Sequence, residues 1–182
     1  NVNAADRDGQ TALIWAAMRG NTEIVTALLA APGLDVNAAD DRGWTALRLA
    51  AGGGHAETVT ALLAYPGLDV NAADRDGQTA FMRATNGGHA ETVMALLAAP
   101  GLDVIAANGD GQAALMLAAN GGHAETITAL LAYPGVDVNA AHHDGRTALM
   151  WAAIGGHAET VTALLAYPGV DANAADGAGR TA

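Results

Sequence analysis

Histidines at a fixed spacing are the first residues of this sequence that could do chemistry. His55, His89, His123 and His157 each follow a glycine and stand 34 residues apart. Histidine is a common metal ligand, but all ligands of one zinc ion must lie within about 2.0–2.1 Å of it. Equivalent residues of packed neighbouring helices lie roughly 8–10 Å apart. We therefore expect no metal to be shared along this series.

Two aspartate-rich segments are the next candidates. Asp6-Arg7-Asp8-Gly9 and Asp74-Arg75-Asp76-Gly77 are similar to the first residues of a calcium-binding loop. The complete loop needs further oxygen ligands and a glutamate at its twelfth position. Ala17 and Thr85 occupy that position here, so we interpret both segments as turns.

The residue types that most enzymes need are missing or badly placed. The sequence contains no cysteine, serine or lysine, which removes the common nucleophiles and the amine of a Schiff base. The paired carboxylates fall in turn-like segments instead of a sheltered cleft, where acid-base catalysis would need them. We predict that the chain is not an enzyme and requires no cofactor. A two-histidine transition-metal site at His142 and His143 stays open as an alternative.

Charge and hydropathy exclude two further classes of function. The chain of 182 residues has a net charge of −11, from 19 acidic residues against eight arginines. Nucleic-acid binding depends on a basic stripe, and a membrane span needs roughly 18 consecutive apolar residues. We therefore expect neither nucleic-acid binding nor a membrane-spanning segment. An Ala-, Gly-, Asp- and Arg-rich chain without lysine is typical of a GC-rich genome, for instance a bacterial one. We expect a cytoplasmic protein, with a secreted bacterial effector as the alternative.

Five near-identical units make up the sequence. Val2, Val36, Val70, Val104 and Val138 are 34 residues apart, and all five prolines keep the same step. A fixed period of this size indicates a stacked array, in which each unit buries its apolar face on its neighbours. We expect one array over 1–182, which is a segment of a longer protein, with units 2–35, 36–69, 70–103, 104–137, 138–171 and a partial unit 172–182.

Each unit contains the signals of two short helices and a turn. In the third unit, Thr79 can cap a helix that runs to about Ala84, and Gly87-Gly88 ends it. Apolar residues at helical spacing then predict a second helix over 89–98, which Pro100 terminates. Proline, glycine and an Asp-x-Asp-Gly sequence follow before the next helix, which predicts an extended arm closed by a tight turn.

This unit resembles the ankyrin repeat. The family's T-P-L-H-x-A signature appears as Thr11-Ala12-Leu13-Ile14-Trp15-Ala16 and as Thr147-Ala148-Leu149-Met150-Trp151-Ala152, with alanine in place of the proline. A 34-residue period also suits tetratricopeptide repeats, but these have no place for the arm and turn. The resemblance implies an all-α solenoid that binds a protein partner through its concave groove. It also implies that the repeated histidine is structural and bonds to backbone near the turn.

The two halves of the unit vary to different degrees. The second helices are nearly identical, whereas the turns and first helices contain all eight arginines and all three tryptophans. In ankyrin arrays this variable half lines the concave groove, and arginine, tryptophan and methionine are enriched in interface cores. We expect the partner-binding residues to be Arg7, Gln10, Ile14, Trp15, Arg19, Arg42, Trp44, Arg48, Arg75, Gln78, Met82, Arg83, Asn86, Gln112, Met116, Asn120, His143, Arg146, Met150, Trp151 and Ile154.

Three functions fit these observations. The first is a protein-binding module whose arginines suit acidic segments of a partner. The alternatives are a structural spacer or self-stacking element that associates end to end through uncapped termini, and a regulatory domain of a larger enzyme. We expect Trp44 and Arg48 to be binding anchors that can be truncated without harm to folding, because their positions vary between units.

The third and fourth units depart from the pattern. Arg83 stands where the other units have leucine or tryptophan, so it must extend outward or meet an acid. Ile105 replaces an asparagine of the arm, and Ala113 replaces the capping threonine. We predict that the fourth unit is a weak point, with a hinge as the alternative reading.

Overall fold

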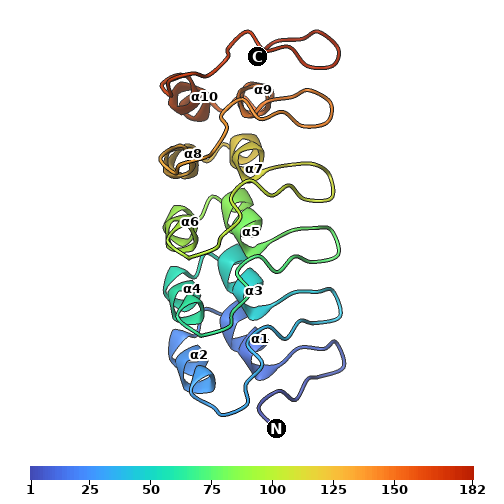
Figure 1. Cartoon of the computed structure of the whole chain (residues 1–182), viewed down its shortest axis with the longest axis vertical. Coiled ribbons are helices and arrows are strands. Elements are labelled where there is room, and N and C mark those ends of the chain that lie inside the picture. The colour runs from blue at the N-terminus through green and yellow to red at the C-terminus, as the bar shows by residue number, and fades with distance from the viewer.

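The computed structural model describes all residues 1–182 and consists of ten short helices in five pairs. The first helices of the pairs form one column and the second helices form another, and a hairpin-like loop projects sideways from each repeat (Figure 1). The helices are α1 (Ala12–Met18), α2 (Thr22–Leu29), α3 (Ala46–Gly52), α4 (Ala56–Leu63), α5 (Ala80–Asn86), α6 (Ala90–Leu97), α7 (Ala114–Gly121), α8 (Ala124–Leu131), α9 (Ala148–Ile154) and α10 (Ala158–Leu165). The predicted all-α solenoid is confirmed.

Sheet structure is limited to one isolated bridge at the base of each of the first five hairpins, such as Ala73 with Thr79. No helix exceeds eight residues, and none is long and apolar enough to cross a membrane. Isolated helices of this length are marginal in water. Packing between repeats must therefore hold them.

Threonine caps begin four of the five first helices. The Thr79 hydroxyl accepts a hydrogen bond from the Met82 N–H at 3.3 Å, as predicted. Ala113 makes no such bond, and the Met116 N–H donates instead to the Ala113 carbonyl at 3.0 Å. The fourth repeat therefore lacks its side-chain cap, but a backbone bond partly replaces it.

The Gly-His pair joins each repeat to the one before it. His89 Nε2 donates to the Gly52 carbonyl at 3.1 Å, and Nδ1 of the same ring faces Gly54. Gly54 has φ +72°, and a Cβ there would lie 2.6 Å from that nitrogen. Glycine is thus required twice, for its backbone conformation and for the space it leaves. The structural role expected for the repeated histidine is confirmed by equivalent bonds from His55, His123 and His157.

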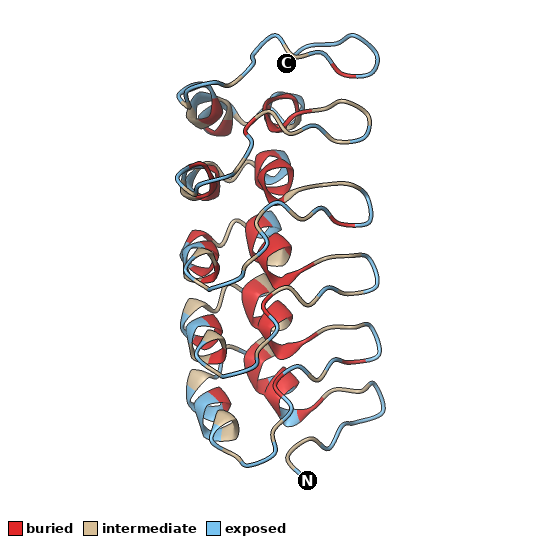
Figure 2. Cartoon of the chain, in the orientation of Figure 1, coloured by how far each residue is buried: buried red, intermediate tan, exposed pale blue.

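The core is a continuous layer between the two columns of helices. Large apolar side chains of both helix columns are buried in it, together with alanines that come mainly from the first helices. Figure 2 shows buried residues in both columns. Each first helix packs directly on the next one. The residues between two first helices must therefore be small or buried by that contact. The large members of this layer include Leu13, Leu47, Phe81, Leu115 and Leu149 from the first helices, with Val25, Val59, Leu62, Val93, Leu96, Ile127, Leu130 and Leu164 from the second helices.

An asparagine in the arm clamps successive repeats together. Asn71 Nδ2 donates to the Gly101 carbonyl at 2.8 Å, and Asn71 Oδ1 accepts from the Asp103 N–H at 2.9 Å. Asn3, Asn37 and Asn139 make the same pair of bonds to their own following arms. Ile105 occupies this position in the fourth repeat, cannot make either bond, and is 71% exposed.

Candidate functional site

The projecting hairpins are fixed by an acidic or amide side chain at their base. In the first hairpin, Asp6 Oδ1 accepts from the Asp8 N–H at 3.0 Å and from the Gln10 N–H at 2.9 Å. The same pair of bonds recurs at Asp40, Asp74, Asn108 and Asp176. These bonds lock five of the six turns, so the residues at those hairpin tips have defined positions before any partner arrives.

Trp15 is the exposed aromatic residue of the first repeat. Its Nε1–H donates to Asp6 Oδ2 at 3.1 Å, and the Arg19 guanidinium carbon lies 5.9 Å from the ring centroid. The side chain is still 40% exposed. The backbone hydrogen bond from Gln10, assisted by the Trp15 bond, lowers the pKa of Asp6. The acid therefore stays ionised and holds the indole in place.

Trp44 of the second hairpin lies close to two arginines. The guanidinium carbons of Arg42 and Arg48 lie 4.9 and 4.7 Å from its ring centroid. Arg48 Nη2 also forms an ion pair with Asp74 Oδ2 of the next hairpin. Burial lowers the pKa of Arg48 and the Asp74 charge opposes this. An arginine that is 4% exposed belongs to the contact between two repeats, so its prediction as a surface anchor was wrong.

Four more predicted surface residues are buried. They occupy the same position as Arg48 in their own helices. In the first four repeats the following first helix packs against the helix that carries this position, and Met150 of the last first helix lies beside Asp176 and Arg180 of the last hairpin. The position varies between repeats because this buried site accommodates several long side chains, and it does not form a binding surface. The corrected residues are Ile14, Met82, Met116 and Met150, which are 0–4% exposed.

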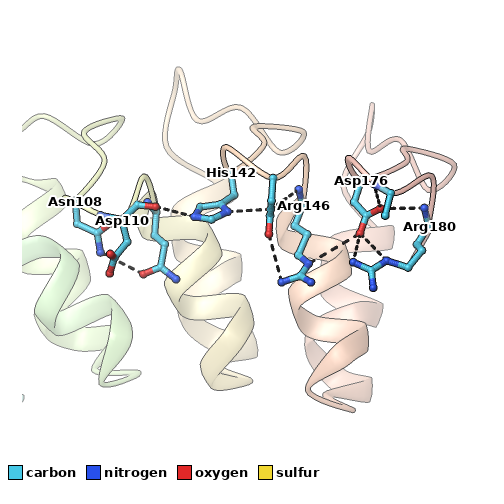
Figure 3. A network of polar contacts seen from close by, with 9 residues as sticks. Asn108, Asp110, His142, Arg146, Asp176 and Arg180 are labelled. Carbon is cyan, nitrogen blue, oxygen red and sulfur yellow. Dashed lines mark hydrogen bonds and ion pairs between the residues drawn. The ribbon is translucent and has the colours of Figure 1, made fainter.

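The hairpin of the fifth repeat has a different residue at the position that holds the turn in the other hairpins. His142 replaces the usual aspartate, and its Nδ1 bonds to Asp144 Oδ1 at 2.9 Å and its Nε2 to the Asp110 carbonyl at 2.7 Å (Figure 3). Each ring nitrogen thus lies within hydrogen-bond distance of an oxygen atom. The His142 hydrogen bond lowers the pKa of Asp144. With both nitrogens engaged, His142 has none free for a metal, which argues against the two-histidine site with His143.

The network continues into the last hairpin. Arg146 Nη1 lies 3.3 Å from Asp144 Oδ2, and Arg180 Nη2 lies 2.7 Å from Asp176 Oδ2 (Figure 3). The Arg180 guanidinium, together with the Arg180 backbone N–H, lowers the pKa of Asp176 to about 2. Trp151 meets the edge of the His142 ring, with centroids 6.2 Å apart. Its buried Nε1–H has no partner, because His142 stands where Asp6 accepts the Trp15 bond.

The remaining sixteen predicted residues stay at the surface, and we call them the variable face. Arg83 is half-buried and makes no ion pair, so it does not meet an acid of a neighbouring repeat. The exposed members are Arg7, Trp15, Arg19, Arg42, Arg75, Asn86, Asn120, His143 and Ile154; the half-buried ones are Gln10, Trp44, Gln78, Arg83, Gln112, Arg146 and Trp151.

Two features of the surface escaped the sequence reasoning. The first is the pairing of every tryptophan with an arginine, which could have been anticipated only where the two lie close in sequence, as in Arg42 and Trp44. The second is an apolar hollow in the fourth repeat, lined partly by Ile105 and Ala113. The unusual residues at these two positions were its signal, but they were interpreted only as a loss of stability.

Stacked helix pairs with projecting hairpins define the class of this protein as a helical-repeat scaffold. The family model described as Ankyrin repeats (3 copies) matches residues 1–74, 23–108, 67–142 and 97–176. The chain belongs to the ankyrin repeat family. A comparison with curated proteins finds no significant match. Ankyrin repeat domains are in general protein–protein interaction modules and are typically non-catalytic.

Proposed function

We propose that the variable face is the concave binding groove of this array and that it recognises a protein partner with exposed acidic side chains. The observation that carries this proposal is that most of the arginines form no ion pair within the chain. Arg48, Arg146 and Arg180 are paired with aspartates. The five others, Arg7, Arg19, Arg42, Arg75 and Arg83, make no ion pair, although the chain has 19 acidic residues.

The tryptophans supply the apolar part of the proposed contact. Each lies against at least one arginine, at 4.7–5.9 Å between the guanidinium carbon and the ring centroid. Tryptophan and arginine are the residue types most enriched among binding hot spots. A cation over an aromatic face also restricts both side chains, so less conformational entropy is lost when a partner binds.

The scaffold supports this function by holding successive repeats in register. The asparagine clamps, the histidine bonds and hairpin-to-hairpin bonds such as Gly109 N–H to the Asp76 carbonyl at 2.8 Å connect neighbouring repeats. Side chains from different repeats therefore keep fixed spacings. A rigid surface of this kind selects a partner by its pattern of charges.

A random peptide library displayed on phage and selected against the immobilised chain tests the proposal. We expect enrichment of peptides rich in Asp and Glu, whose binding weakens when salt is raised and when Arg42 is replaced by alanine. Thr60→Ala on α4 is the matched control, because Thr60 is exposed and lies outside the variable face. Selection of basic peptides, or equal loss of binding with Thr60→Ala, would refute it.

A further inference from the structure

The fourth repeat contains a donor and an acceptor that have lost their partner. In the other arms, a glycine carbonyl and an aspartate backbone N–H bind the carboxamide of the asparagine in the preceding arm, at 2.8–2.9 Å. The equivalent groups here are the Gly135 carbonyl and the Asp137 N–H. Ile105 stands in place of the asparagine, and neither group makes a hydrogen bond within the protein. The acceptor and the donor that bind a carboxamide in the other arms are therefore both present here, but the carboxamide is missing.

An apolar hollow lies beside these two groups. Its volume is about 260 Å³, and nine of its 11 lining residues are hydrophobic. Gly135 and Asp137 are the other two. The Ala113 substitution contributes to the apolar wall, because the hydroxyl of the usual threonine is missing there. The Met116 N–H is already bonded to the Ala113 carbonyl at 3.0 Å, so it does not add a free donor.

The two unpartnered groups specify the ligand's polar end. A group that binds both must donate to the Gly135 carbonyl and accept from the Asp137 N–H, and a primary carboxamide does both from one planar unit. A carboxylate cannot donate, and it would face both the carbonyl oxygen and the negative charge of Asp137. An alcohol has one oxygen atom to serve both groups, whereas each of the four asparagines uses two separate atoms, Nδ2 and Oδ1. The chemistry therefore favours a neutral primary amide.

The hollow specifies the rest of the ligand. A dry apolar cavity of about 150 Å³ is enough to hold benzene, so this hollow can hold one ring. Ligand sites are typically concave and apolar with a few placed polar groups, and this arrangement has that character. We propose that the fourth repeat binds a small molecule with an apolar ring and a primary carboxamide. The site shares no residue with the variable face, so it is independent of the proposed partner contact.

Titration of the whole chain with benzamide, followed by amide NMR shifts, tests this assignment. We expect saturable shifts centred on residues 113–116 and 135–137. N,N-dimethylbenzamide keeps the ring and carbonyl but has no N–H to donate, so its binding should be weaker by about five- to tenfold. Benzoate should produce no saturable shift at these residues.

Two variants separate the site from a general apolar surface. Ile105→Asn restores the internal carboxamide and should abolish benzamide binding in a protein that is at least as stable as the original. Ile105→Val keeps the position apolar and should bind benzamide within about twofold of the original affinity. Equal binding of N,N-dimethylbenzamide, retention of benzamide binding by Ile105→Asn, or shifts spread evenly over all five arms would each overturn the assignment.

Discussion

The guanidinium of Arg48 is buried against the carboxylate of Asp74, 26 residues further along the chain. Asp74 also accepts two backbone N–H bonds that fix the base of the third hairpin. One side chain of the second repeat therefore reaches the residue that organises the third. This contact couples the first helix of one repeat to the hairpin of the next.

Truncation of Arg48 should destabilise the protein, contrary to the expectation from sequence variability. Arg48→Ala leaves Asp74 as a buried charge without its partner, and breaking a buried pair from one side costs about 3–5 kcal/mol. The free energy of unfolding from urea titration measures this loss. Arg42→Ala is the matched control, because Arg42 is exposed and unpaired, and it should change stability by less than about 0.5 kcal/mol. Equal stability of the two variants would show that the buried pair contributes nothing.

Restoration of the fourth repeat should stabilise the array. Ile105→Asn adds two hydrogen bonds to the next arm and should contribute about 1 kcal/mol. Ala113→Thr restores a cap, but its gain should lie near the lower end of about 0.5–2 kcal/mol, because the Met116 N–H already has a backbone acceptor. Thermal unfolding of the two variants measures these gains.

The same reasoning predicts where the array opens first. Amide hydrogen exchange should be faster over residues 105–115 than over 70–81, because the third repeat has both the asparagine clamp and the threonine cap and the fourth repeat has neither. If the two segments exchange at the same rate, the fourth repeat is compensated by other contacts and is neither a weak point nor a hinge.

Acid should weaken the last hairpin at a defined pH. The bonds from Arg180 lower the pKa of Asp176 from 3.8 to about 2. A carboxyl whose pKa is lower in the folded state stabilises that state above its unfolded pKa, and this contribution is lost as pH falls from about 4 to 2. Carboxyl NMR titration should give a higher pKa for Asp176 in Arg180→Ala. An unchanged value would show that the Arg180 side chain does not hold the acid.

The sequence predicts the repeat architecture well, because the residues that form it recur in every unit. Thr79, Gly88 and Pro100 mark the helix ends locally, and their counterparts mark the same ends elsewhere. The predicted end of the first helix at Ala84 was two residues short of the observed end at Asn86. Helix termini are set by the last few backbone bonds, which residue patterns locate only to within a turn.

The candidate site could be predicted only in part. Exposed residues such as Trp15 and Arg42 were found because they vary between units. Variation did not distinguish them from Arg48 or Met82, which occupy a buried position that tolerates several long side chains. The partner of Arg48 lies in the next repeat, so no local pattern reveals it.

The affinity of one selected acidic peptide for four variants of the chain tests the central claim most directly. Trp15→Ala and Arg42→Ala on the variable face should each weaken binding by roughly 1–2 kcal/mol, measured by calorimetry. Thr60→Ala and Glu57→Gln on α4 should leave affinity within about 0.5 kcal/mol of the original. Loss of binding in the α4 variants, with Trp15→Ala and Arg42→Ala silent, would contradict the assignment of the binding surface to the variable face.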